Sequence, residues 1–106
     1  MTTIAIVQVT CPDLESAQAI ASALLDERLI ACANIVAPCL SVYRWESAIE
    51  TTHEAIMQVK TLPETAALVA ERIAALHPYD LPAIEHWAAE TDDAGYRWIA
   101  DAAARV

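Results

Sequence analysis

The chain has 106 residues, of which 57% are hydrophobic and 20% are charged, with 15 acidic residues against 6 basic ones. This length is typical of one domain, and so many apolar residues exclude a disordered chain. The net charge of −9 disfavours nucleic acid and anionic membranes as partners, because both are polyanionic. No apolar run is long enough to span a bilayer, and no basic segment of a signal peptide is present. We therefore expect a single domain over residues 1–106.

The hydrophobic pattern alternates between the spacings of strands and of helices. Pro38 cannot donate a hydrogen bond to a strand ladder, so a bulge or an edge position is expected there. Asp13 and Asp93 each precede a helical pattern and can cap the helix that follows. In chain order, the predicted elements are strand 4–10, helix 13–29, strand 33–45, strand 50–61, helix 63–76, strand 84–89 and a last helix from residue 93.

This order of elements predicts the fold class. A central hairpin between two helices is typical of an α+β, ferredoxin-like β-α-β-β-α-β sandwich, here with an antiparallel sheet and an additional C-terminal helix. The helices can cover only one sheet face, and yet the first strand is apolar on both, with Ile6 pointing one way and Val7 the other. An uncovered apolar face normally marks an interface. We therefore expect an oligomer and assign Val7 to the bare face.

The three cysteines and the single glycine argue against disulfide, phosphate-binding and nucleophilic chemistry. Cys11, Cys32 and Cys39 form an odd set without a Cys-x-x-Cys pair, which favours free thiols in a reducing, cytoplasmic compartment. The single glycine cannot build a phosphate-binding loop, and no nucleophile elbow is present. No nucleophile–base pair can be named, so we expect neither an enzyme nor an organic cofactor.

The remaining polar groups indicate a weak metal site. The last strand should pair antiparallel with the first, which brings the loop at His77 beside Cys11. A thiol and an imidazole suit Cu(II) or Zn(II), and Asp80 and Glu46 are candidate oxygen donors at the same end of the sheet. Such a set predicts an open site for Cu(II) or another divalent cation. The alternative is that Cys11 is a small buried hydrophobe and His77 caps a helix end.

Five motifs follow one another along the chain: Ala31-Cys32-Ala33-Asn34, Tyr43-Arg44-Trp45-Glu46, Lys60-Thr61, His77-Pro78-Tyr79 with Pro82, and Tyr96-Arg97-Trp98-Ile99. Together they resemble the CutA family of divalent-cation tolerance proteins. Their order and spacing over residues 4–99 carry the resemblance. It implies a ferredoxin-like fold in a homotrimer whose long central strands pair between subunits. It also implies a cytoplasmic protein with a role in tolerance to copper and other divalent metals.

Three positions depart from the family's pattern. Val9 stands where the family often has a cysteine, Ala83 stands where it often has a glutamate, and Ser47 stands at the glycine of the hairpin turn. Of the family's usual ligand candidates, Cys32 and His77 are retained, whereas Cys11 comes from the topology alone.

The resemblance leaves a second function open, because the family's trimer resembles that of the PII signalling proteins. A regulatory module of that kind would bind a partner protein or a small ligand in clefts between subunits. The motif residues expected at such a cleft are Tyr43, Trp45, Lys60 and Tyr79.

Overall fold

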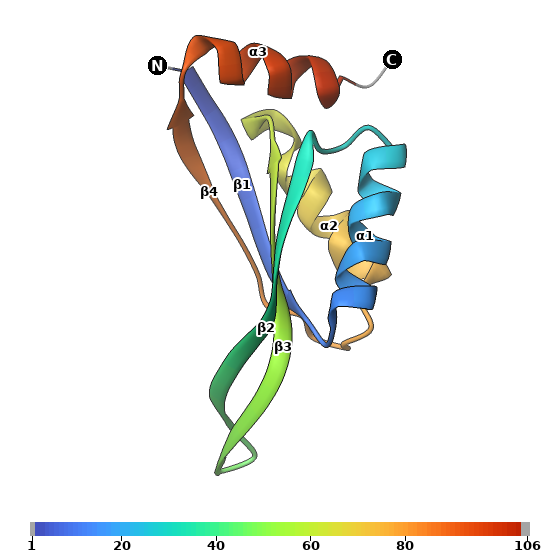
Figure 1. Cartoon of the computed structure of the whole chain (residues 1–106), viewed down its shortest axis with the longest axis vertical. Helices are drawn as coiled ribbons and strands as arrows, with labels where there is room; N and C mark the ends of the chain where they lie inside the picture. The colour runs from blue at the N-terminus through green and yellow to red at the C-terminus, as the bar shows by residue number, and fades with distance from the viewer. Residues whose placement is uncertain (1, 105–106) are drawn as a thin grey trace.

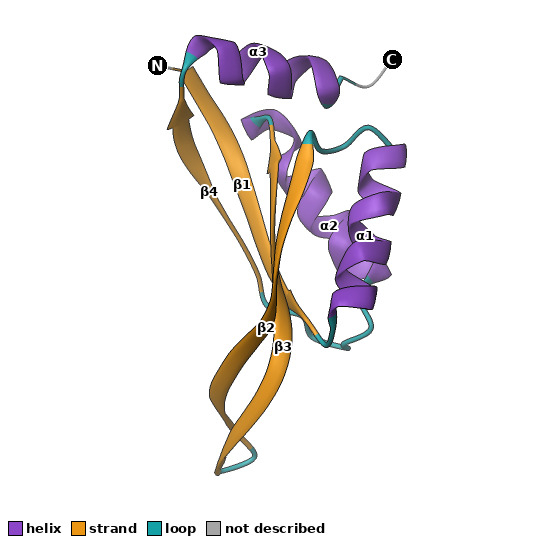
Figure 2. Cartoon of the chain, viewed as in Figure 1, coloured by secondary structure: helices purple, strands orange, loops and turns teal. Residues whose placement is uncertain are grey.

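The structure, a computed structural model, describes residues 2–104 as one four-stranded sheet with helices packed against it (Figures 1 and 2). The strand order is β2-β3-β1-β4, and every neighbouring pair is antiparallel. The predicted ferredoxin-like α+β class with an additional C-terminal helix is therefore confirmed. The elements are β1 (Thr2–Cys11), α1 (Leu14–Asp26), β2 (Cys32–Trp45), β3 (Ala48–Thr61), a 3₁₀ turn (Pro63–Thr65), α2 (Ala66–Leu76), β4 (Ile84–Thr91) and α3 (Asp93–Ala102).

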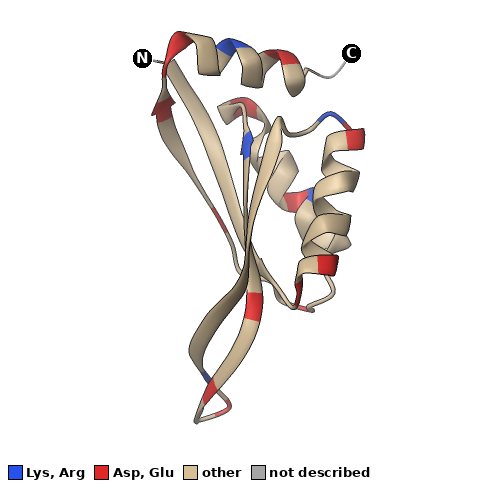
Figure 3. Cartoon of the chain, viewed as in Figure 1, with Lys and Arg blue, Asp and Glu red and all other residues tan. Residues whose placement is uncertain are grey.

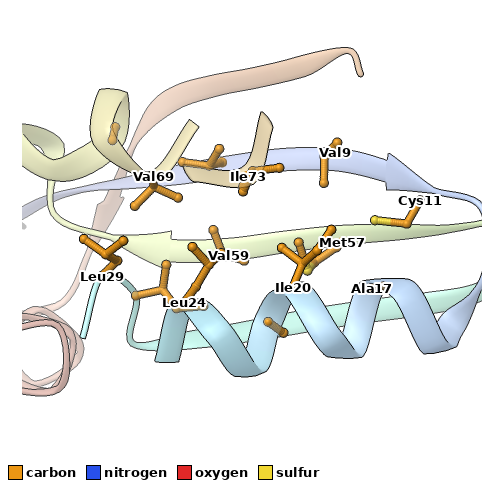
Figure 4. Close-up of a cluster of buried hydrophobic side chains, with 14 of the residues drawn as sticks. Val9, Cys11, Ala17, Ile20, Leu24, Leu29, Met57, Val59, Val69 and Ile73 are labelled. Atoms are coloured by element: carbon orange, nitrogen blue, oxygen red, sulfur yellow. The ribbon is translucent and has the colours of Figure 1, made fainter. Parts of the chain in front are cut away.

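The hydrophobic core lies between α1, α2 and one face of the sheet (Figure 4). Odd-numbered residues of β1 and β3 point toward the helices and pack against a stripe of aliphatic residues on each helix. Burying one such side chain is worth ~1.5–3 kcal/mol relative to leaving it exposed. The fully buried members of this core include Val7, Val9, Leu24, Leu29, Met57, Val59, Val69 and Ile73.

The assignment of Val7 to the bare face was wrong. Val7 has no exposed surface and belongs to the core under the helices, whereas Ile6 lies on the opposite face and stays half-buried. The alternating pattern fixes which residues share a face, but two apolar faces do not reveal which one the helices cover. We call the uncovered side the open face, and its central members are Ile6, Gln8, Asn34, Val36, Ile56, Gln58, Lys60, Glu85 and Trp87.

The helix α3 crosses the end of the sheet where β1 begins (Figure 1). Its Ile99 packs with Ile4 and Ala31 in a second, smaller cluster of buried residues. Asp92, and not the predicted Asp93, caps this helix, because the Gly95 N–H donates to the Asp92 carboxylate at 2.7 Å. Asp93 is the first helical residue, where a carboxylate also suits the helix dipole.

Gly95→Ala is expected to destabilise the protein by about 1 kcal/mol. A Cβ at this position would lie 2.6 Å from both the Asp92 carboxylate and the Thr91 hydroxyl, so the cap would have to open. The free energy of urea unfolding measures the loss. Asp92→Ala should cost a similar amount, and the double variant should cost little more than either single one. Fully additive losses would contradict a shared cap.

The strands β2 and β3 form a hairpin that extends well beyond the helices (Figure 1). Its turn is Glu46–Ser47, and both residues have positive φ, at 49° and 69°, without a glycine. The predicted irregularity at Pro38 is confirmed, since Val36 pairs with Ile56 while Cys39 pairs with Glu54. The projecting part exposes large apolar side chains, including Leu40 at 58%, Val42 at 62%, Trp45 at 59% and Ile49 at 62%.

Candidate functional site

His77 anchors the loop between α2 and β4 to the end of β1. Its side chain is 8% exposed, and its Nε2 lies 2.9 Å from the Thr10 carbonyl oxygen. The Tyr79 backbone N–H donates to its Nδ1 at 3.0 Å. Because Nδ1 accepts, Nε2 must carry the proton and donate to Thr10. The imidazole is therefore neutral with both nitrogens engaged, and a metal ion would have to replace one of these bonds.

Cys11 is the last residue of β1, and its sulfur points into the core (Figure 4). The side chain has no exposed surface. Burial, with smaller contributions from the negative charges of Asp13 and Glu54, raises the pKa of this thiol to about 11. Cys11 is therefore a protonated, buried thiol at neutral pH. Cys32 and Cys39 are also free, as the odd number of cysteines predicts.

The raised pKa of Cys11 predicts a loss of stability in alkali. The folded state holds this proton more tightly than the unfolded state, whose thiol has the ordinary pKa of 9.0. Stability is therefore complete below pH 9 and falls as the pH rises toward the folded value of about 11, by about 2 kcal/mol at pH 11. The pKa of Tyr79 is raised as well, mainly by burial and by Glu54, and its effect has the same sign.

Urea unfolding of the parent and of Cys11→Ala at pH 8 and pH 11, at one protein concentration, tests this prediction. The main causes of the raised pKa of Tyr79, burial and Glu54, are the same in both proteins, so Tyr79 contributes nearly equally to both. The variant should lose about 2 kcal/mol less than the parent between the two pH values. Equal losses would show that the thiol does not titrate as its burial requires.

The remaining two predicted ligands do not join this pair. Asp80 is exposed in the loop, and Glu46 lies in the hairpin turn. Cys11 pairs with Ala55, seven residues from the start of β3 at Ala48, so the turn lies at least ~20 Å away along the strand. Within residues 2–104, no three His, Cys, Asp or Glu side chains come together in a way that could hold a metal. A metal site made of all four residues stays a prediction, because these residues do not come together within one chain.

A tyrosine cluster links the same loop to the projecting hairpin. The Tyr79 hydroxyl donates to the Glu54 carboxylate at 2.5 Å, and the His77 and Tyr79 ring centres are 4.8 Å apart. Nearby, the Tyr43 and Thr52 hydroxyls are 3.0 Å apart. Glu54 was not predicted as a site residue. In the sequence, nothing marks Glu54 beyond its position in a strand that pairs with β2. Only the conformation of the loop brings Tyr79 to Glu54.

The predicted cleft residues separate into three places within one chain. Tyr43 lies near enough to Tyr79 to raise the pKa of Tyr79, in addition to burial and Glu54. Trp45 is beside the hairpin turn and is 59% exposed. Lys60 lies near the opposite end of β3, where its Nζ donates to the side-chain oxygen Oδ1 of Asn34 at 3.5 Å. The PII-like alternative therefore stays a prediction, because it needs a cleft to which further copies contribute.

Comparison with known proteins identifies the class to which this fold and loop belong. The model of the family CutA1 divalent ion tolerance protein matches residues 5–102. The divalent-cation tolerance protein CutA of Pyrococcus horikoshii is 47% identical over 79 residues, which cover 74% of this chain and 76% of the relative. The chain belongs to the CutA1 divalent ion tolerance family.

Solved structures agree with this assignment. The divalent ion tolerance protein CutA1 of Ehrlichia chaffeensis superposes with a TM-score of 0.93 at 36% identity, over 98% of both chains. The structure described as the periplasmic divalent cation tolerance protein CutA of Archaeoglobus fulgidus has a TM-score of 0.90 at 34% identity, over 95% of this chain and 99% of the other. In the part of this chain that the structure describes, no helix is long and apolar enough to cross a membrane.

Proposed function

We propose that the chain acts as a homotrimeric, non-enzymatic protein of the cytoplasm that binds Cu(II) and other divalent cations weakly and supports tolerance to them. The names of the relatives support a role in divalent-cation tolerance. The three free cysteines support a reducing compartment.

The observation that carries the trimer is the projecting hairpin. A single copy leaves its large apolar side chains 58–62% exposed. Contiguous apolar surface of this kind is normally covered by a partner. β2 is also an edge strand of the sheet, so its outer backbone groups remain available to pair with another chain. Further copies of the same hairpin can cover the side chains and occupy the edge together.

The proposed metal ligands are His77 and Cys11, with Asp80 and Glu46 as oxygen donors. An assembly can place the hairpin turn of one copy, and with it Glu46, against the loop of another. Binding is weak for two reasons. The metal must replace a hydrogen bond of His77, and it must displace a thiol proton held with a pKa of about 11, which costs about 5 kcal/mol at pH 7.

Titration with Cu(II) tests the metal site. His77→Ala and Cys11→Ser should each weaken binding at least tenfold, and binding by the parent should weaken as the pH falls because protons compete with the metal. His53→Ala and Cys39→Ser are the matched controls, since they remove the same groups from the projecting hairpin. Equal affinity of all five proteins would show that the acidic surface binds cations without a specific site.

A further inference from the structure

A row of polar side chains crosses the open face from one edge of the sheet to the other. The strand registers place Gln8 opposite both Glu85 and Gln58, and Gln58 opposite Asn34. Gln58 Nε2 donates to Gln8 Oε1 at 2.7 Å, and Gln8 Nε2 donates to Glu85 Oε1 at 3.3 Å. Beside the row, Lys60 Nζ donates to Asn34 Oδ1 at 3.5 Å. We call Glu85, Gln8, Gln58 and Asn34 the polar row.

The polar row lies between apolar side chains. Ile6 and Trp87 flank it on one side, and Ile56 and Val36 flank it on the other. Trp87 and Val36 are 40% and 61% exposed, so apolar side chains that a partner could cover lie on both sides of the row. A partner that covers the apolar residues must therefore cover the row as well.

The row leaves hydrogen-bonding capacity that such a partner must satisfy. Several side-chain groups make no hydrogen bond to the rest of the chain within residues 2–104. They are Gln58 Oε1, the second carboxylate oxygen of Glu85 and two of the three N–H groups of Lys60. Covering them with an apolar surface would leave buried polar groups without partners, which is unfavourable. The occupant must offer both donors and acceptors at this place.

We infer that the polar row is the element by which the open face recognises a second copy of the same chain. This inference rests on the proposed homotrimer and says what makes its contact selective. A second copy supplies Lys60 N–H groups for the Glu85 carboxylate and amide groups for Gln58. Neither Lys60 nor Glu85 has an ion-pair partner within the described residues, and their charges are opposite. The contact is therefore balanced in charge, although each copy carries a net charge of −9, with acidic residues on helices and strands alike (Figure 3).

Replacement of the glutamines tests the row. Gln58→Leu removes the donor to Gln8 and should raise the concentration at which the trimer dissociates at least tenfold, because the Gln8 amide is then buried with an unmet acceptor. Gln8→Leu/Gln58→Leu also takes the N–H donor away from Glu85 Oε1, so it should weaken association at least as much as Gln58→Leu. Gln18→Leu, on the exposed side of α1, is the matched control and should change nothing.

A charge exchange tests whether the partner is a second copy. Lys60→Glu should weaken association at least tenfold, because it places two carboxylates together, and Lys60→Glu/Glu85→Lys should restore it. Sedimentation across a concentration series measures all variants, and circular dichroism checks that each is folded. If Gln58→Leu does not fold, the charge exchange decides alone.

The outcomes separate this inference from the proposed function. A parent protein that is monomeric at micromolar concentration overturns the homotrimer and leaves the open face to another partner. A trimeric parent with unchanged Gln58→Leu and Lys60→Glu variants overturns the role of the row and leaves the homotrimer in place. Failure of the charge exchange to restore association would likewise show that Lys60 and Glu85 of different copies do not meet.

Discussion

Leu40→Asp is expected to convert the proposed homotrimer into folded monomers. Leu40 is 58% exposed on the projecting hairpin and makes no part of the core under the helices. In the assembly, the substitution would lose ~1.5–3 kcal/mol of burial at each contact and would bury a carboxylate as well. We expect the dissociation concentration to rise at least 100-fold, measured as molar mass by light scattering over a dilution series.

Leu68→Asp is the matched control for this experiment. Leu68 is 40% exposed on α2, away from the hairpin and the open face, and the same substitution there should leave the mass unchanged. Circular dichroism should show native secondary structure in both variants. A trimer that persists in Leu40→Asp, or one that both variants weaken equally, would contradict assembly through the hairpin.

Val7→Asp is expected to prevent folding altogether. Val7 has no exposed surface in the core between the sheet and the helices. The variant loses ~1.5–3 kcal/mol of burial and places a carboxyl group among aliphatic side chains without a hydrogen-bond partner. The total is of the order of the whole stability of a small domain, ~5–15 kcal/mol. Circular dichroism should show an unfolded chain without a cooperative transition in urea.

Val36→Asp makes the corresponding change on the open face, where the side chain is 61% exposed. This variant should fold and unfold cooperatively in urea, and it should associate less tightly than the parent. The two variants therefore distinguish the sheet faces: a carboxylate on the covered face prevents folding, and one on the open face weakens association. If Val7→Asp folded and only lost its assembly, the original assignment of Val7 to the bare face would be restored and the structure contradicted at that residue.

The fold was predictable because its signals are local. Alternating apolar residues, a capping Asp13 and the bulge at Pro38 each act within a few residues, and each is present where the sequence indicates it. The ends of elements were less predictable. Helix α1 ends at Asp26 and not near Leu29, because Arg28 adopts a positive φ of 55° and the apolar residues that follow enter the core from the connecting segment.

The candidate site was predictable only in part because it depends on contacts between distant segments. The antiparallel pairing of β1 and β4 correctly brought His77 to the end of β1. It could not indicate that the imidazole would bond Thr10 and Tyr79, or that Glu54 would meet Tyr79. The prediction that the turn after the second strand lies at this end placed Glu46 there without accounting for the length of the hairpin. Backbone carbonyl partners carry no residue-type signal, so only the folded chain shows them.

The bulge at Pro38 sets the phase of the hairpin. Before it, even-numbered residues of β2 share the open face, as the pairing of Val36 with Ile56 shows, and after it the odd-numbered Cys39 faces Glu54 on that same side. Tyr43 and Trp45 therefore continue the open face outward, and Leu40 and Val42 take the reverse side. Removing one residue from the bulge would exchange these two sets while leaving every residue beyond it unchanged. The one extra residue of this bulge thus decides whether aromatic or aliphatic side chains extend the face on which the polar row lies.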